Sequence, residues 1–190
     1  RNCMKRVKLV VAYDGTNYCG WQIQPNGITI EEILNRQISK LTGEDIRIIG
    51  ASRTDSGVHA LGNVAVFDTE SRIPGDRFAY ALNQKMPEDI VIVRSDEVQI
   101  DWHPRYQNEI SKTYEYHIYN AKVRNPLKNR YSTFVSFDLD VEKMRQGAKY
   151  ILGEHDFASF CNVRTNAKDT VRTVHEITIK EIPMDKFQAS

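Results

Sequence analysis

The stretch TIEEILNRQISKLTG, residues 29–43, decides the fold class of the chain around it. Isoleucine and leucine recur in it at helical spacing, forming an apolar stripe of Ile30, Ile33, Leu34, Ile38 and Leu41. Thr29 and Glu32 fit a capping box, in which each side chain accepts a hydrogen bond from an amide at the start of the helix. Gly43 can take the left-handed conformation that ends many helices. The sequence therefore predicts an amphipathic helix with one face against a core.

Strand patterns flank this helix on both sides. The predicted strands are residues 7–12, 46–49, 64–67 and 90–93. The second and third are joined by a short connection with two glycines, which favours a hairpin. A second helix lies between the last two strands, with Asp76 as its predicted N-cap and Pro87 as its stop. The order β-α-β-β-α-β is that of a ferredoxin-like (RRM-like) domain.

A related pattern restarts in the second half of the chain. Its predicted strands are residues 113–119, 130–137 and 171–182, and Asp140 caps a predicted helix that Gly153 ends. We expect an α+β fold with two ferredoxin-like halves, residues 5–105 and 110–190, whose antiparallel sheets meet in a central cleft. The second half is predicted to be incomplete, because nothing apolar enough follows Ile182 to finish the repeat.

The composition is that of a soluble globular protein. Hydrophobic residues make up 41% of the 190 residues and charged residues 27%. No apolar run is long enough for a transmembrane helix, and no secretory signal is visible, so we expect no membrane association. Three cysteines without a Cys-x-x-Cys pair predict neither a disulfide framework nor a zinc site, and favour a cytoplasmic protein. The histidines lack ligand spacing, so we expect no metal.

A net charge of +1 does not by itself indicate a nucleic-acid-binding protein, so the positions of the basic residues must carry that hypothesis. They form two local groups, one of Lys122, Arg124, Lys128 and Arg130, the other of Arg164, Lys168 and Arg172. Such groups can track a phosphate backbone, and solvated loops are an equally good interpretation.

The segment ASRTDSGVH, residues 51–59, follows a predicted strand and is the strongest candidate for chemistry. In an extended chain Arg53 and Asp55 point to the same side, and the arginine would keep the carboxylate ionised and oriented. An ionised, oriented carboxylate can act as a nucleophile. The alternative is a turn with a surface ion pair, and spacing alone favours that alternative.

Two aromatic residues, Tyr114 and Tyr116, share one face of the predicted strand 113–119. Aromatic side chains on a sheet can stack on a nucleobase, and they are equally good core residues. The pattern alone favours a core position for one of the two.

Two hydrolase hypotheses lack essential parts. Residues 12–16, AYDGT, resemble the Asp-x-Asp-Gly-Thr of aspartate-nucleophile phosphatases, but Ala12 stands where the nucleophile is needed. Ser52, Asp55 and His59 are the ingredients of a triad, but Gly-x-Ser-x-Gly is absent and residues so close in sequence rarely reach the geometry.

These motifs together resemble the tRNA pseudouridine synthase A family over about residues 6–182. The similar segments are YDGTNYCGWQ at 13–22, SRTDSGVHA at 52–60, ALN at 81–83, MPEDI at 86–90, HPR at 103–105, KTYEY at 112–116 and LGEHDFASF at 152–160, with the region around Arg172. The resemblance implies isomerisation of uridine to pseudouridine in the tRNA anticodon stem-loop, at tRNA positions 38, 39 and 40, by a homodimer without a cofactor.

The resemblance also implies roles for individual residues. Asp55 is the nucleophile or the acceptor of a ribose proton, Arg53 pairs with Asp55 and holds the flipped nucleotide, and Tyr114 packs on the target base. We add four candidate substrate-binding residues, which are His59, Lys128, Arg130 and Arg172. Chemistry on a paired base requires that the base leave the stack.

Two other hypotheses stay open on the sequence. The resemblance implies a further C-terminal segment, and a chain that truly ends at Ser190 would be a non-catalytic RNA-binding module. The chain could also be a structural or dimerisation protein in which Arg53 and Asp55 form only an ion pair.

Overall fold

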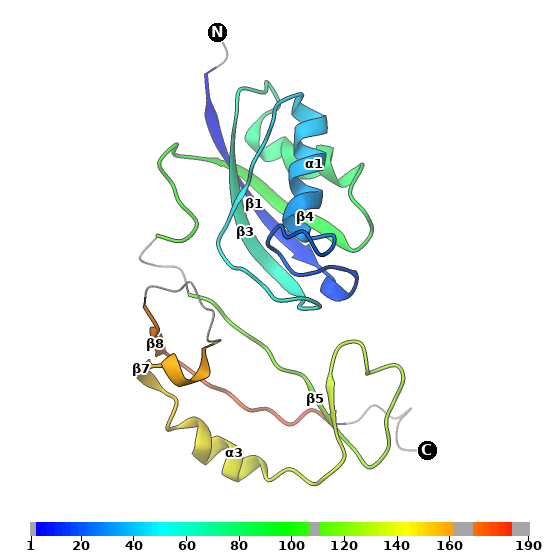
Figure 1. Ribbon diagram of the computed structural model, residues 1–190, viewed down its shortest axis with the longest axis vertical. Helices are drawn as coiled ribbons and strands as arrows, with labels where there is room; N and C mark the ends of the chain where they lie inside the picture. The colour runs from blue at the N-terminus through cyan, green and yellow to red at the C-terminus, as the bar shows by residue number, and fades with distance from the viewer. Residues whose placement is uncertain (1–2, 107–110, 162–168, 184–190) are drawn as a thin grey trace. The chain divides into compact units, whose positions relative to one another are not determined.

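The computed structural model describes residues 3–106, 111–161 and 169–183. The chain divides into two compact units, Arg1–Tyr114 and Glu115–Ser190. The predicted α+β class with antiparallel pairing is confirmed in the first unit, where two helices and a four-stranded antiparallel sheet form one body (Figure 1). No helix among the described residues is both long enough and apolar enough to cross a membrane.

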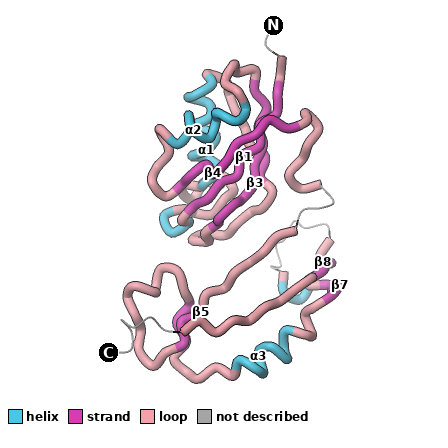
Figure 2. The backbone as a smooth tube through the Cα atoms, turned by 180° about the vertical axis from the view of Figure 1, so that it is seen from behind, coloured by secondary structure: helices cyan, strands magenta, loops and turns pink. Residues whose placement is uncertain are grey.

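The sheet of the first unit has the strand order β2-β3-β1-β4. Its strands are β1 (Lys5–Tyr13), β2 (Ile49–Gly50), β3 (Ala60–Thr69) and β4 (Ile90–Val98), and every neighbouring pair is antiparallel. Along β1, Val7, Leu9, Val11 and Tyr13 are buried and alternate with partly exposed residues. This alternation gives the sheet one core face, which α1 (Ile30–Thr42) and α2 (Phe78–Asn83) cover (Figure 2).

Helix α1 begins and ends at the residues that the sequence predicts. The Thr29 side chain accepts a hydrogen bond from the amide of Glu32, and Gly43 takes a left-handed φ of 74°. The Glu32 carboxylate forms an ion pair with Arg36 one turn further on, at 3.0 Å. Ile30, Leu34 and Ile38 are fully buried, so the apolar stripe faces the sheet as expected.

Thr29→Ala is expected to lower the free energy of unfolding by about 1–2 kcal/mol, because it leaves the Glu32 amide without its acceptor. Urea unfolding measures this change. Lys40→Ala, an exposed site on the same helix, is the matched control and is expected to stay within about 0.5 kcal/mol of the parent. An unchanged urea midpoint for Thr29→Ala would show that the Thr29 cap does not stabilise the protein.

Two predictions about the first unit are wrong in detail. Asp76 does not cap α2: it lies inside a 3-10 turn (η2, Gly75–Arg77), and Arg77 occupies the N-cap position without a side-chain hydrogen bond. The predicted strand 46–49 pairs only at its end. Side chains of α1 capture its amides, since Ile46 donates to the Ser39 hydroxyl and Ile48 to the Asn35 amide oxygen.

The second unit has shorter elements than the sequence predicts. Its strands and helix are β5 (Ile118–Asn120), β6 (Thr133–Val135), α3 (Val141–Ala148), β7 (Gly153–Asp156) and β8 (Val171–Val174). Asp140 caps α3 as predicted, but the helix ends at Ala148, and Gly153 opens β7 instead. The pairing of β7 with β8 is antiparallel, whereas β5 and β6 are parallel, which corrects the prediction of antiparallel pairing throughout.

The well-packed core lies in the first unit. All buried hydrophobic side chains among the described residues belong to it, from Val7 to Ile92. The three long strands predicted in the second half, 113–119, 130–137 and 171–182, shrink to the three or four paired residues of β5, β6 and β8. An apolar alternation forms a full strand only where a partner layer buries one of its faces.

Candidate active site

Asp55 lies in the connection from β2 to β3. The amide of Ala51 still bonds to the carbonyl of Val64 at 2.8 Å, so the chain leaves the sheet just before Ser52. Asp55 then opens a tight turn, in which its carbonyl accepts from the Val58 amide at 3.1 Å and Gly57 takes a positive φ of 79°. The Asp55 side chain is exposed at this turn. A rigid sheet edge therefore presents the carboxylate to solvent.

Residues 52–59, here called the Asp55 segment, bond to residues 14–21, here called the site loop. The Trp21 amide donates to the Thr54 carbonyl at 3.0 Å. The Gly57 amide and the Ser56 hydroxyl both donate to the Tyr18 carbonyl, at 3.3 and 3.2 Å. These bonds lie on both sides of Asp55, so the site loop sets the position of its backbone.

Two glycines of the site loop allow this close approach. A Cβ on Gly15 would lie 2.0 Å from the Val58 carbonyl oxygen. A Cβ on Gly20, which has a φ of 79°, would lie 2.6 Å from the Thr54 carbonyl oxygen. No real Cβ tolerates such distances, so the two segments fit together only with glycine at both positions.

Buried aromatic side chains support the Asp55 segment from the core. The Tyr13 phenol shares a hydrogen bond of 2.7 Å with the Thr54 hydroxyl, and it accepts from the Asn63 amide, which also holds the Ser52 carbonyl. Burial raises the pKa of Tyr13, so its phenol keeps its proton at neutral pH. Trp21, also buried, packs so closely on Gly50 that a Cβ there would lie 2.6 Å from its Nε1.

Arg53 does not pair with Asp55. Within the described residues no ion pair joins their side chains, although both are exposed as the extended arrangement requires. The positive charge of Arg53 lies close enough to Glu31, at the start of α1, to influence the pKa of that carboxyl. Burial raises the pKa of Glu31, and the nearby positive charges of Arg53, Arg105 and Arg47 partly offset that rise. The predicted Arg53–Asp55 pair is therefore absent from this structure.

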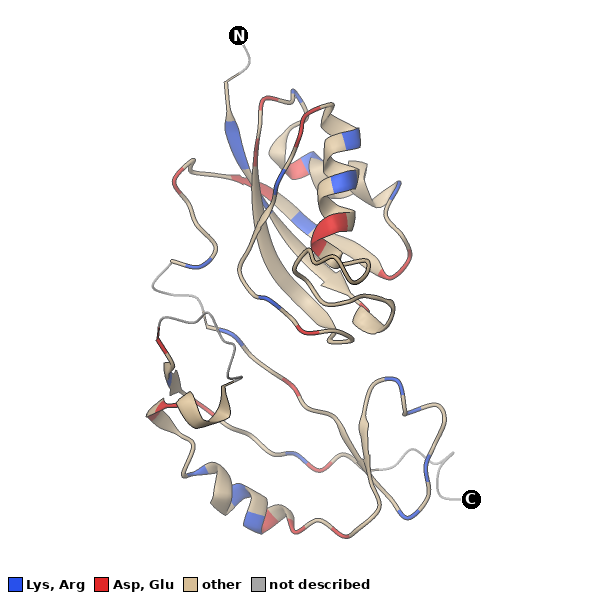
Figure 3. Ribbon diagram, viewed as in Figure 1, with Lys and Arg blue, Asp and Glu red and all other residues tan. Residues whose placement is uncertain are grey.

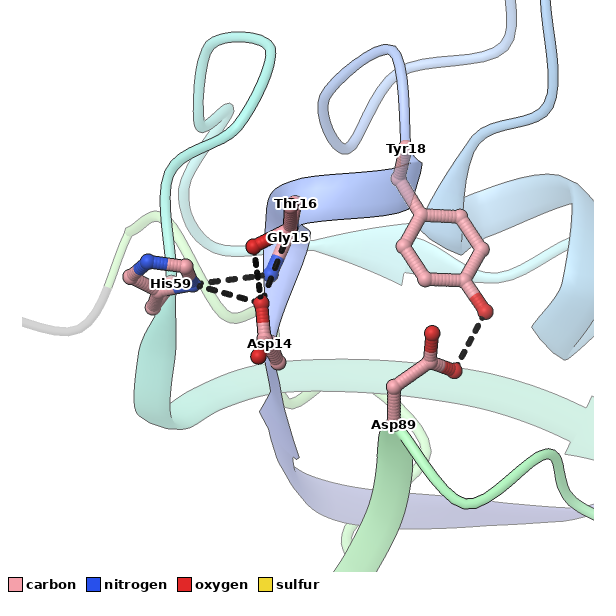
Figure 4. Close-up of polar contacts among 6 residues, drawn as sticks. All are labelled: Asp14, Gly15, Thr16, Tyr18, His59 and Asp89. Atoms are coloured by element: carbon pink, nitrogen blue, oxygen red, sulfur yellow. Dashed lines mark hydrogen bonds and ion pairs between the residues drawn. The ribbon is translucent and has the colours of Figure 1, made fainter. Parts of the chain in front are cut away.

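His59 closes the other end of the Asp55 segment on the site loop (Figure 4). Its Nδ1 lies 3.0 Å from the Gly15 amide nitrogen and 3.1 Å from Oδ1 of Asp14. An Nδ1 without a proton accepts from Gly15, and one with a proton donates to Asp14, so the two contacts belong to different protonation states. Asp14 also accepts from the amide and the hydroxyl of Thr16. Either state ties His59 to the site loop.

Tyr114 ends the first unit and is 68% exposed. Lys112, two residues earlier, donates from Nζ to the Ala51 carbonyl at 3.2 Å, which attaches this stretch to the chain just before Ser52. The predicted strand from Thr113 does not form before Ile118. Tyr116 is 89% exposed, so the prediction that one of the two tyrosines lies in the core is wrong.

The candidate phosphate contacts Lys128, Arg130 and Arg172 belong to the second unit. Lys and Arg recur along the loop between β5 and β6, which carries the first two (Figure 3). The Arg130 guanidinium lies 5.9 Å from the Tyr131 ring centre, and Arg172 donates to the carbonyls of Asp169 and Val171. Arg164 and Lys168 lie outside the described residues.

Comparison with known proteins decides the family. The family model described as tRNA pseudouridine synthase matches residues 9–107 and 148–189. The tRNA pseudouridine synthase A of Acetivibrio thermocellus is 49% identical over 186 residues, which cover 97% of this chain and 76% of that protein. The chain belongs to the tRNA pseudouridine synthase family. The family resemblance read from the sequence is thereby confirmed.

Two further relatives carry the same family name. The tRNA pseudouridine synthase A 2 of Clostridium perfringens (strain 13 / Type A) is 48% identical over 177 residues, covering 93% of this chain and 72% of that protein. The tRNA pseudouridine synthase A of Thermoanaerobacter sp. (strain X514) is 44% identical over 178 residues, which cover 94% of this chain and 72% of that protein. The range 9–107 matched by the family model contains both the site loop and the Asp55 segment.

Sequence reasoning missed the residues that hold the Asp55 segment in this pseudouridine synthase. In the sequence Gly15 signals a turn, and Tyr18, Gly20 and Trp21 stand as parts of a motif; nothing local links any of them to the position of Asp55. Two glycines at fixed places between buried aromatic residues were the available signal, because such glycines often mark a close approach of two backbones. The partner of that approach lies more than thirty residues away in the sequence, at residues 54–59.

In the described part of the chain, no three His, Cys, Asp or Glu side chains come together in a group that could hold a metal ion. The groups available at the candidate site are one exposed carboxylate, one exposed guanidinium and an imidazole held by the site loop. Such a set can attack or deprotonate a substrate and bind a phosphate.

Proposed function

We propose that this chain converts uridine to pseudouridine in tRNA, with Asp55 as the reactive carboxylate. The reaction breaks the bond between ribose C1′ and base N1 and forms a bond between C1′ and base C5. The proton on C5 leaves and N1 gains one, so the change is an isomerisation that needs no oxidant or reductant. The observation that carries the proposal is the exposed Asp55 on a turn that buried residues hold from both sides.

The neighbouring residues take roles that suit this chemistry. Asp55 attacks the nucleotide or accepts a ribose proton, and both roles require an ionised carboxylate in a fixed place. Arg53, exposed two residues away, binds the phosphate of the target nucleotide rather than Asp55. Tyr114 stacks on the target base after it leaves the helix, and His59 orders the segment beside the nucleotide.

The finer features of the proposal concern the substrate and the assembly. The target is the anticodon stem-loop at tRNA positions 38, 39 and 40, and the chain acts as a homodimer in the cytoplasm. Residues 5–105 and 110–190 are two halves of one ferredoxin-like plan. The element order β-α-β-β-α-β and the strand order β2-β3-β1-β4 of the first unit support this plan for the first half.

Release of tritium from tRNA labelled at C5 of uridine tests the proposal, because only a new bond at C5 expels that hydrogen. The protein is expected to release tritium from an unmodified tRNA without any added metal or cofactor. Salt-sensitive binding of the same tRNA without release would contradict the proposal and leave a non-catalytic RNA-binding module.

The double variant Lys128→Ala, Arg130→Ala is expected to weaken tRNA binding and to make its salt dependence shallower. Each lost phosphate contact lowers the slope of log affinity against log salt by about one. Filter binding across a salt series measures the slope. Lys40→Ala removes one positive charge from the exposed side of α1 and is expected to leave the slope unchanged. A double variant with the parent slope would mean that the loop between β5 and β6 does not contact the RNA.

A further inference from the structure

Asp89, the residue just before β4, contacts both ends of the turn that begins the site loop, and Figure 4 shows its side-chain contact with Tyr18. Its backbone carbonyl accepts from the Asp14 amide at 3.0 Å. Its carboxylate accepts from the Tyr18 phenol at 2.6 Å. Because Asp89 directly precedes β4, which pairs along its length with the central strand β1, these two bonds attach residues 14–18 to the packed sheet.

Tyr18 carries this constraint to the Asp55 segment. Its ring is only 8% exposed and its amide donates to the Gly15 carbonyl at 3.0 Å. Its own carbonyl accepts from the two residues that follow Asp55, the Ser56 hydroxyl and the Gly57 amide. The phenol–Asp89 bond and the Gly57 bond therefore hold the same residue, one through its side chain and one through its backbone.

We propose that Tyr18 and Asp89 are positioning residues for the reaction, which hold the turn after Asp55 so that its carboxylate meets the target nucleotide. This inference rests on the proposed function, in which Asp55 reacts. Neither residue is placed to touch the substrate, since the phenol is bonded to Asp89 and acts on Asp55 only through the backbone. A shift of about 1 Å in a reacting group can lower a rate about a hundredfold, so a small loosening of this turn is enough to matter.

The phenol keeps the proton that this arrangement needs. Burial raises the pKa of Tyr18 well above its usual value, and the carboxylate of Asp89 raises it further. Tyr18 therefore stays protonated at neutral pH and donates its hydrogen bond to the Asp89 carboxylate.

Tyr18→Phe removes the phenol and leaves the ring, so it tests the bond to Asp89 directly. We expect kcat for tritium release to fall about tenfold to a hundredfold, because Asp55 is no longer held in its orientation. KM for tRNA is expected to stay within about twofold of the parent value, because no contact with tRNA is lost. Tyr80→Phe is the matched control, since the Tyr80 ring is 71% exposed and its phenol makes no hydrogen bond within the described residues. This control is expected to have the parent kcat.

Variants of Asp89 separate positioning from a general loss of stability. Asp89→Asn keeps an oxygen that can accept from the phenol and is expected to retain most of the parent kcat. Asp89→Ala is expected to have the same kcat as Tyr18→Phe. The double variant Tyr18→Phe, Asp89→Ala is expected to have a kcat no lower than either single variant, because both changes remove the same hydrogen bond. Glu88→Ala, the neighbouring exposed acid, is the control for loss of a charge.

Hydrogen exchange at the Gly57 amide gives a readout that does not depend on activity. That amide donates to the Tyr18 carbonyl, so its exchange is expected to quicken in Tyr18→Phe and in Asp89→Ala and to stay at the parent rate in Tyr80→Phe. Parent kcat together with parent Gly57 exchange in Tyr18→Phe would overturn the inference, as would a loss confined to KM or a loss equally large in Asp89→Asn.

Asp55→Asn, measured in parallel, separates the proposed reaction through Asp55 from the proposed positioning role of Tyr18 and Asp89. Full turnover in Asp55→Asn would remove Asp55 from the reaction, and the proposed role of its turn with it. An inactive Asp55→Asn beside a fully active Tyr18→Phe would overturn only the role of Tyr18 and Asp89, leaving the proposed function in place.

Discussion

Asp55→Asn is expected to abolish tritium release while tRNA binding and stability stay close to those of the parent. Removal of a nucleophile lowers kcat by about four orders of magnitude or more in well-studied enzymes. The change costs little structurally, because within the described residues the Asp55 carboxylate makes no hydrogen bond or ion pair and is exposed. The unfolding free energy is therefore expected to change by less than about 0.5 kcal/mol.

The comparison that checks this result uses three measurements on one preparation. Tritium release reports turnover, filter binding reports affinity for tRNA, and urea unfolding reports stability. Asp76→Asn makes the same change at another exposed position of the first unit and is expected to behave like the parent in all three. If Asp55→Asn released tritium at the parent rate, another group would have to perform the chemistry.

Gly15→Ala is expected to have the second largest effect, on stability and turnover together. The added methyl carbon would lie 2.0 Å from the Val58 carbonyl oxygen, a backbone atom that cannot swing aside as a side chain can. Separating the site loop from the Asp55 segment strains a packed region, which costs about 1–3 kcal/mol. The same displacement moves Asp55, so kcat is expected to fall about tenfold or more.

Gly147→Ala is the matched control for this change. Gly147 lies in α3, where an added Cβ meets nothing within 4 Å, and alanine in a helix is about 0.5–1 kcal/mol more favourable than glycine. Thermal unfolding and tritium release are measured for both variants. A Gly15→Ala protein that melts and turns over like the parent would show that the close approach of residues 15 and 58 is not needed.

The features predictable from the sequence are those with local causes. Thr29 and Gly43 cap α1 where expected, because the capping groups lie within one turn of the helix ends they bond to. The apolar run at residues 7–12 predicts a strand, and these residues form most of β1. Spacing alone favours a turn with a surface ion pair at Asp55, and of these two features the turn is present.

The features that escaped prediction depend on contacts between distant parts of the chain. Ile46 and Ile48 have a strand-like pattern, but their amides donate to the side chains of Ser39 and Asn35 instead of to a neighbouring strand. Nothing in the local sequence predicts these hydrogen bonds. The predicted Arg53–Asp55 pair does not form, because both side chains are exposed and a spacing of two residues does not by itself hold a solvated ion pair together. In the second unit, alternation overstated the strands because the described residues include no buried layer to pack against.

The residues that hold Asp55 illustrate the same limit within one site. Tyr18 and Trp21 look like ordinary core aromatics in the sequence, and both are indeed buried. Their importance lies in backbone groups, the Tyr18 carbonyl and the Trp21 amide, which bond to the Asp55 segment. Backbone groups are the same in every residue, so their partners become visible only in three dimensions.

Mapping the product on a single tRNA tests the central claim most directly. An unmodified tRNA transcript with uridines at positions 38, 39 and 40 is incubated with the protein, treated with the carbodiimide that marks pseudouridine, and read by primer extension. We expect stops at these positions with the parent and none with Asp55→Asn. Stops elsewhere only, or stops at 38–40 that persist in Asp55→Asn, would contradict the assignment of this chain as an anticodon-stem-loop pseudouridine synthase that acts through Asp55.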